Sequence, residues 1–143
     1  MDRFPDVQKT LQKMKAEDKF DLVMFSNGSH VTLKNARSTH DILKIVFPEK
    51  TVLSVDDVQA YKPSRKAYNH LLKSVDKMER PQDVVLISSN PFDICGARAM
   101  GMEALWINRT NGGWIDQLGD GPTWIAKSFA ELAKFPYSLD SQV

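Results

Sequence analysis

The sequence predicts an α/β fold built on a doubly wound, Rossmann-like parallel sheet. Helical patterns alternate with short apolar runs along the 143 residues, as in sheets that carry helices on both faces. The runs are almost continuously apolar, which is typical of strands buried on both sides. No internal repeat or low-complexity segment interrupts this order. We therefore expect residues 1–143 to form a single domain.

The first predicted elements are a helix and a strand. Pro5 precedes apolar residues with helical spacing, and proline is favoured in the first turn of a helix. The apolar run 20–25 has the pattern of a buried strand, and the polar residues 26–29 that follow it predict a turn. Apolar residues within 31–47 predict a second helix, which must end before Pro48. We expect the cap of this helix near Ser38 or Thr39.

The remaining elements continue the alternation. Residues 51–55 form the second predicted strand, and a helix with core positions at 67, 71, 72 and 75 follows the loop that ends at Pro63. The third strand is predicted at 83–87 and the fourth at 103–107. Between them, a helix over 91–100 ends at Gly101, which we expect in the left-handed conformation. A capping-box pattern at 128–131 predicts a short closing helix.

Composition and charge exclude several classes of protein. The 19 basic and 18 acidic residues nearly cancel to a net charge of +1, which argues against nucleic acid or a membrane surface as a partner. No apolar run approaches the ~20 residues that span a bilayer. Cys95 is the single cysteine, and the first residues do not resemble a signal peptide. We expect a cytoplasmic protein.

Polar residues follow three of the predicted strands, at the edge of the sheet where ligands bind in parallel α/β folds. Ser26-Asn27-Gly28-Ser29 offers hydroxyl, amide and backbone N–H groups for an anion. Turn formation explains this loop equally well, because Asn and Gly tolerate positive φ and Ser29 can cap the next helix.

The second loop places Lys62 just before a helix, where an ammonium adds to the positive end of the helix dipole. Taken alone, a lysine beside a proline is more simply a solvated loop residue. Tyr68 falls early in the same helix. Its phenol could point into a pocket, although a tyrosine here is more often core with a wet tip.

The third loop, Ser88-Ser89-Asn90-Pro91-Phe92-Asp93, also has two interpretations. Asn90 suits an N-cap and Asp93 the first turn of a helix, so capping explains the residue types. Capping does not explain why a lysine and two hydroxyl or amide clusters follow neighbouring strands, as expected of a site. His30, His40 and His70 lack ligand spacing, which argues against a zinc site, and no glycine-rich nucleotide-binding motif occurs. We expect no metal and no other cofactor.

The three loops, together with Gly96-Ala97-Arg98 and Trp106-Ile107-Asn108-Arg109, resemble the haloacid dehalogenase superfamily. The resemblance is strongest to the (S)-2-haloacid dehalogenases and runs in order from about Phe4 to Leu132. It implies hydrolytic cleavage of the carbon–halogen bond of small 2-haloalkanoic acids. A phosphatase is disfavoured, because phosphatase members present two acids in the third loop for magnesium and this loop has only Asp93.

The resemblance implies roles for individual residues. Ser26 and Asn27 match the motif that binds the substrate carboxylate and the leaving halide. Phe92 matches an aromatic near the halide, and Tyr68 a position that supports the substrate.

The implied catalytic residues come from the second and third loops. Lys62 matches the lysine that balances the charge of the nucleophile. Asp93 matches the carboxylate that positions or activates water, and Ser88 and Asn90 match positions that support it. Asp56 and Asp57 do not match the family's metal motif, so we interpret them as turn residues.

The family's aspartate nucleophile, which ends the first strand, has no counterpart here. Asp2 and Asp6 flank a predicted helix, and Asp21 lies at the wrong end of a strand. The resemblance therefore implies a core without its first, central strand and without the helical cap. We expect no dehalogenase turnover from this chain alone.

A missing central strand has a structural consequence. The neighbouring strands must either close up over a spacing of roughly 4.8 Å or leave unpaired backbone groups. We expect an isolated chain to be marginally stable, or to need a second copy or a complementing chain. An alternative function is a nonenzymatic domain that keeps an anion pocket around Ser26, Asn27 and Lys62 and binds a partner.

Overall fold

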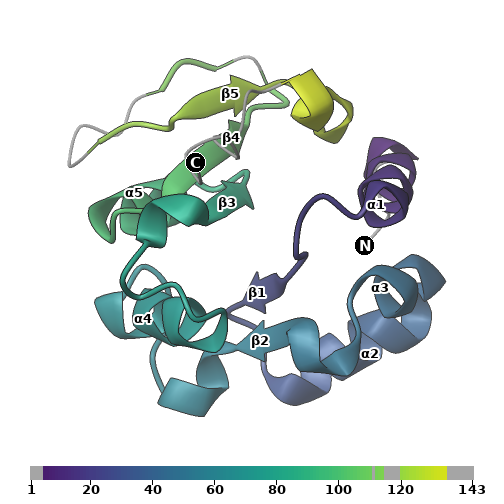
Figure 1. Ribbon diagram of the computed structural model, residues 1–143, viewed down its shortest axis with the longest axis horizontal. Helices are drawn as coiled ribbons and strands as arrows, with labels where there is room; N and C mark the ends of the chain where they lie inside the picture. The colour runs from purple at the N-terminus through teal and green to yellow at the C-terminus, as the bar shows by residue number, and fades with distance from the viewer. Residues whose placement is uncertain (1–4, 111, 115–119, 135–143) are drawn as a thin grey trace. The chain divides into compact units, whose positions relative to one another are not determined.

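The computed structural model describes residues 5–110, 112–114 and 120–134 (Figure 1). The chain divides into two compact units, residues 1–61 and residues 62–143, each with its own sheet. All pairings between the described strands are parallel. The predicted α/β class with parallel strands is therefore confirmed. A single domain over the whole chain remains a prediction.

The first unit contains a two-stranded sheet and three α-helices. Its elements are α1 (Pro5–Glu17), β1 (Met24–Ser26), α2 (His30–Thr39), α3 (Asp41–Val46), η1 (Glu49–Thr51), β2 (Val52–Ser54) and η2 (Val55–Val58). α2 contacts β2, and α3 packs against α1 and α2. The apolar side chains buried in this unit are Leu11, Leu33, Ile42, Val46, Phe47 and Val55. Burial of these side chains holds the carboxyl ends of β1 and β2 in register, with Ser26 opposite Ser54.

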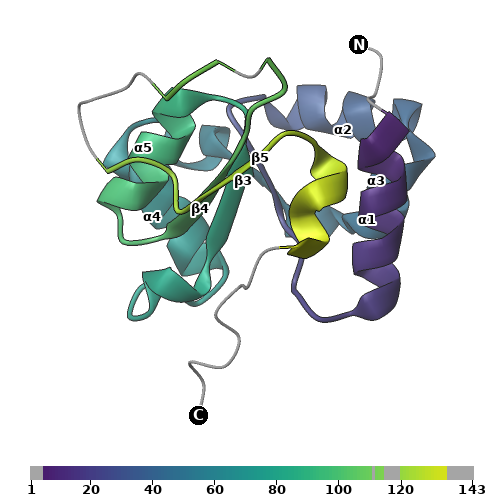
Figure 2. The same cartoon turned by 90° about the horizontal axis from the view of Figure 1, so that it is seen from above.

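The second unit contains a three-stranded sheet in the order β3-β4-β5. Its elements are α4 (Arg65–Ser74), η3 (Pro81–Asp83), β3 (Val85–Ser88), α5 (Pro91–Ala99), β4 (Glu103–Ile107), β5 (Trp124–Ala126) and η4 (Phe129–Lys134). α5 lies along β3 and β4 in both views and also contacts α4 (Figures 1 and 2). The largest fully buried side chains here are Tyr68, Leu72, Ile94, Met102, Leu105 and Leu132. This packing fixes the first turn of α5, which carries Asp93.

The segment 31–47, in which one helix was predicted, contains parts of two helices. α2 ends at Thr39 and α3 begins at Asp41, because His40 between them has extended backbone with φ −127° and ψ 104°. The cap expected near Ser38 or Thr39 lies one residue further along, because His40 is the N-cap of α3 and makes no side-chain capping hydrogen bond. The hydroxyls of Ser38 and Thr39 donate to carbonyls four residues earlier, and the cap of α2 is Ser29. Hydroxyls that donate to a carbonyl four residues earlier lie within a helix and do not cap its start.

The strands also differ from the prediction. β1 covers only the last part of the run 20–25 and continues to Ser26. β5 was not predicted, because it is three residues long and its central Ile125 is 49% exposed. A single edge strand of this length leaves no periodic signal. Gly101 has the expected positive φ, at 85°.

The described strands form two sheets instead of one. Among the described strands, β1 pairs only with β2, and β3 pairs only with β4. A core without its central strand was expected either to close the gap or to leave unpaired backbone groups. No described strand of one sheet pairs with a described strand of the other.

Candidate active site

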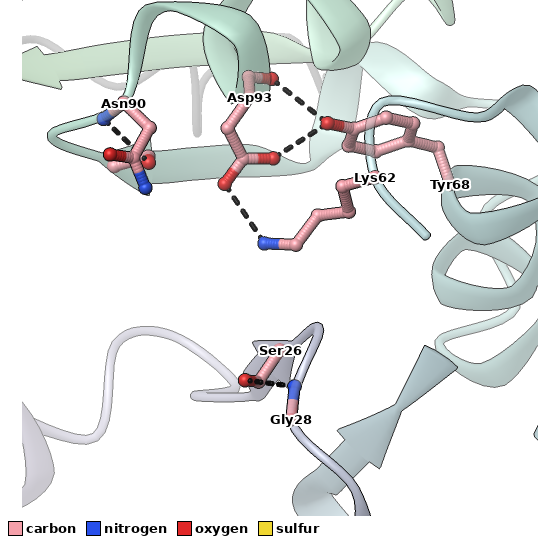
Figure 3. Close-up of polar contacts among 7 residues, drawn as sticks. Ser26, Gly28, Lys62, Tyr68, Asn90 and Asp93 are labelled. Atoms are coloured by element: carbon pink, nitrogen blue, oxygen red, sulfur yellow. Dashed lines mark hydrogen bonds and ion pairs between the residues drawn. The ribbon is translucent and has the colours of Figure 1, made fainter. Parts of the chain in front are cut away.

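Three predicted site residues come together in the second unit, and we call them the Asp93 cluster: Lys62, Tyr68 and Asp93. The Lys62 Nζ lies 2.9 Å from Oδ2 of Asp93. The Tyr68 hydroxyl donates to Oδ1 of the same carboxylate at 2.6 Å and approaches its backbone carbonyl at 3.3 Å. Figure 3 shows both donors converging on the carboxylate. Lys62 and Tyr68 therefore both contact the Asp93 carboxylate directly.

Local structure explains how each member of the cluster is placed. Ser64 caps α4 by accepting from the N–H of Lys66, so the helix begins just after Lys62. Tyr68 then lies on the first turns of α4 and is fully buried. Asp93 lies on the first turn of α5, where a carboxylate is favoured by the helix dipole. Asp93 is only 4% exposed, so Lys62 and Tyr68 replace the water molecules that would otherwise donate to its carboxylate.

Burial is the main cause that raises the pKa of the Tyr68 phenol, and its hydrogen bond to Asp93 adds to this effect. The phenol therefore stays protonated and remains a donor. Asp93 accepts one hydrogen bond on each oxygen, and a carboxylate oxygen has a second lone pair. The cluster can thus hold an ionised carboxylate in one orientation with capacity for a further donor, such as water.

The loop before α5 is ordered by two other hydrogen bonds. Ser88 Oγ accepts from the backbone N–H of Asn90 at 3.1 Å, and the indole Nε1–H of Trp106 donates to the Ser89 carbonyl at 3.1 Å. Asn90 has the backbone conformation of an N-cap, but its side chain makes no capping hydrogen bond. The capping interpretation is therefore wrong for this side chain, which is exposed. Phe92 is also exposed, at 43%.

The predicted anion loop, residues 26–29, belongs to the first unit. The N–H of Gly28 donates to Ser26 Oγ at 2.9 Å, as Figure 3 shows. Ser26 Oγ accepts in this hydrogen bond, so the hydroxyl hydrogen of Ser26 does not take part in it. Ser29 caps α2, as one interpretation predicted. Asn27 and Gly28 form a bend without the positive φ that these residue types tolerate.

Ser54 was missed by the sequence analysis, although it contacts the anion loop. Its side chain is fully buried and donates to the Gly28 carbonyl at 2.7 Å. The same oxygen accepts from the N–H of Asp56 at 3.1 Å. A polar residue at the end of a buried strand was the available signal. Ser54 ties the loop after β1 to the loop after β2.

A second tie joins the same two loops. His30 Nε2 lies 2.6 Å from Oδ1 of Asp57. This hydrogen bond is the largest cause that raises the pKa of His30, and the charge of Asp57 adds to it. The pair was not predicted, because His30 was considered only as a metal ligand and Asp57 only as a turn residue. Both side chains are partly exposed.

The described residues contain no group of three or more His, Cys, Asp or Glu side chains placed to hold a metal ion. No described helix combines the length and the apolar character needed to cross a membrane.

Asp6 lies in the first turn of α1 and not at the end of a strand. A sequence profile of the haloacid dehalogenase-like hydrolases matches residues 2–101. The chain belongs to this family. The predicted resemblance is therefore confirmed at the level of the family.

Individual members of the haloacid dehalogenase-like hydrolase family agree with this assignment. An (S)-2-haloacid dehalogenase of Pseudomonas putida is 31% identical over 133 residues, which are 92% of this chain and 55% of the relative. The enzyme of the same name from Pseudomonas sp. strain YL is 35% identical, over 92% of this chain and 53% of the relative.

A crystal structure of an L-2-haloacid dehalogenase superposes with a TM-score of 0.81 at 28% identity. The superposition covers 92% of this chain and 55% of that structure. The chain thus spans about half the length of the relatives it matches.

Proposed function

We propose that this chain supplies part of the active site of a 2-haloacid dehalogenase, which hydrolyses the carbon–halogen bond of small 2-haloalkanoic acids. The observation that carries the proposal is the Asp93 cluster, a buried carboxylate held by one cationic and one phenolic donor. Such a carboxylate can orient water without moving, because both of its oxygens are already fixed. The substrate class follows from the relatives, which are (S)-2-haloacid dehalogenases.

In this proposal Ser26 and Asn27 bind the substrate carboxylate. Ser26 is suited to the role because Gly28 donates to its oxygen and leaves the hydroxyl hydrogen for an anion. The exposed ring of Phe92 offers an apolar contact for the halogen. Ser88 and Asn90 keep the backbone before α5 in place.

Hydrolysis also needs a nucleophile. We propose that an aspartate carboxylate from another segment displaces the halide and forms an ester with the substrate. Water held by Asp93 then attacks the ester, which yields the 2-hydroxy acid and restores the carboxylate. A complementing segment outside residues 1–143 supplies this aspartate. A cytoplasmic site of action is part of the proposal, since one cysteine suits a reducing compartment.

Complementation tests the proposal directly. The chain is mixed with the segment of the Pseudomonas putida relative that it does not match, and chloride release from 2-chloropropionate is measured. We expect release from the mixture and none from either part alone. Release by this chain alone would contradict the proposed origin of the nucleophile. Absence of release from a folded, associated mixture would contradict the proposed reaction.

A binding measurement tests whether the loop of residues 26–29 binds the substrate carboxylate. Calorimetry with 2-chloropropionate is expected to give heat with the wild-type chain and at least tenfold weaker binding with Ser26→Ala. Ser74→Ala is the matched control, because the Ser74 hydroxyl is exposed and bonds only within α4. Equal binding by both variants would remove Ser26 from the proposed site.

A further inference from the structure

Gly96 lies on α5 three residues after Asp93, at the point where the helix meets the Tyr68 ring. A Cβ atom added to Gly96 would lie 2.5 Å from the Tyr68 Oη and 2.6 Å from its Cζ. Carbon and oxygen atoms that are not bonded stay well beyond 3.0 Å, so an alanine does not fit beside this ring. The ring occupies the space that a side chain at position 96 would need.

We propose that Gly96 is a positioning residue: the absence of its Cβ lets the Tyr68 ring lie against α5, where the hydroxyl reaches the Asp93 carboxylate. The close approach of the Tyr68 ring to Gly96 does not depend on the proposed function. Its importance for catalysis rests on the proposed function, in which Asp93 holds water.

The helix itself gives no reason for a glycine. Gly96 is in the interior of α5 and does not have positive φ, so its backbone conformation is open to any residue. Glycine is one of the least favourable residues in a helix interior, and alanine the most favourable. A glycine here therefore requires an explanation from packing, which the Tyr68 ring supplies.

Tyr68 cannot simply move away from a side chain at position 96. Its residue is fully buried, and it lies on α4 among the buried residues Ala67, Leu71 and Leu72. Dense packing leaves a ring few alternative positions. A displaced ring would also lose the 2.6 Å hydrogen bond from Oη to Asp93. Asp93 would then retain the hydrogen bond from Lys62 but not the one from Tyr68.

The first test is a pair of Gly96→Ala variants of the full chain, one with Tyr68 and one with Tyr68→Leu. We expect Gly96→Ala to lower the urea midpoint when Tyr68 is present. In the Tyr68→Leu chain the same change should leave the midpoint unchanged or raise it, because leucine can turn away and alanine favours the helix. Gly113→Ala is the control, since a Cβ there meets nothing within 4 Å.

The sign of the effect decides the result. A similar fall in both backgrounds, or no fall with Tyr68, would overturn the inference. If Gly96→Ala with Tyr68 does not fold, folding of the double variant supports it. Failure of the double variant, when Tyr68→Leu alone folds, counts against it.

The second test reads the position of the Tyr68 hydroxyl. Carbon-13 labelling at Cζ of tyrosine allows each phenol to be titrated by NMR. Gly96→Ala should bring the Tyr68 titration down toward that of an ordinary tyrosine, because the ring loses burial and its bond to Asp93. An unchanged titration would show that Gly96 acts on stability alone. Neither test involves substrate, so failure of the proposed function leaves both readouts valid.

Discussion

The ammonium of Lys62 and the carboxylate of Asp93 form an ion pair of 2.9 Å across 31 positions of the sequence. Their side chains are only 10% and 5% exposed. Two charges so far removed from water depend on each other, because neither can be solvated if the other is lost.

Lys62→Met tests this dependence. The variant keeps the length of the side chain and leaves the Asp93 charge without its cation, which is expected to cost about 3 kcal/mol of unfolding free energy. Urea denaturation measures the change. Lys66→Met removes an exposed lysine of α4 and should have little effect. Equal losses from the two variants would show that the ion pair contributes nothing specific.

The hydroxyl of Tyr68 can be removed without changing the ring. In Tyr68→Phe, Oδ1 of Asp93 loses its 2.6 Å donor in a buried environment. We expect a loss of roughly 1–3 kcal/mol in unfolding free energy. Tyr61→Phe makes the same chemical change at a residue that is 66% exposed. A midpoint in urea that is the same for both variants would contradict the assigned hydrogen bond.

Ser54→Ala leaves the Gly28 carbonyl and the Asp56 N–H without their shared partner. These groups are partly buried, so the expected cost is roughly 1–3 kcal/mol. The amide resonances of Asn27 and Gly28 should shift in a nitrogen-15 NMR spectrum. Ser74→Ala, which removes an exposed hydroxyl bonded to a backbone carbonyl, should move neither resonance. Unshifted resonances in Ser54→Ala would contradict the tie between the two loops.

The pair of His30 and Asp57 should respond to pH. Its hydrogen bond raises the pKa of His30 above 6.5, so the charged form is favoured in the folded state. The stability from this pair is therefore fully present below about pH 6.5 and is lost as the pH rises through the raised value. NMR titration of the His30 ring should give a lower pKa in Asp57→Asn. Asp21→Asn, at an exposed position, is the control, and an equal response to both changes would exclude a specific pair.

The fold class was predictable because buried parallel strands are apolar along their whole length. That signal located β2, β3 and β4 within a few residues. It failed at β5, where tertiary pairing stabilises three residues that have little apolar pattern of their own. It also failed at His40, because an apolar period that resumes after one extended residue resembles a continuous helix.

The candidate site was also predictable only in part. Lys62 and Asp93 were identified because they follow the carboxyl ends of strands, and their contact agrees with that rule. Ser54 and Gly96 were missed because their roles arise from contacts that no local pattern records. One is a buried hydroxyl between two loops, and the other is a missing Cβ beside a ring.

The contact between Gly96 and Tyr68 also limits the order in which mutations can accumulate at these two positions. A lineage that places alanine at position 96 must first exchange the tyrosine for a smaller residue. In the opposite direction, the glycine must arise before the tyrosine can be accepted. Among homologous sequences, alanine or a larger residue at position 96 should therefore occur without tyrosine at position 68.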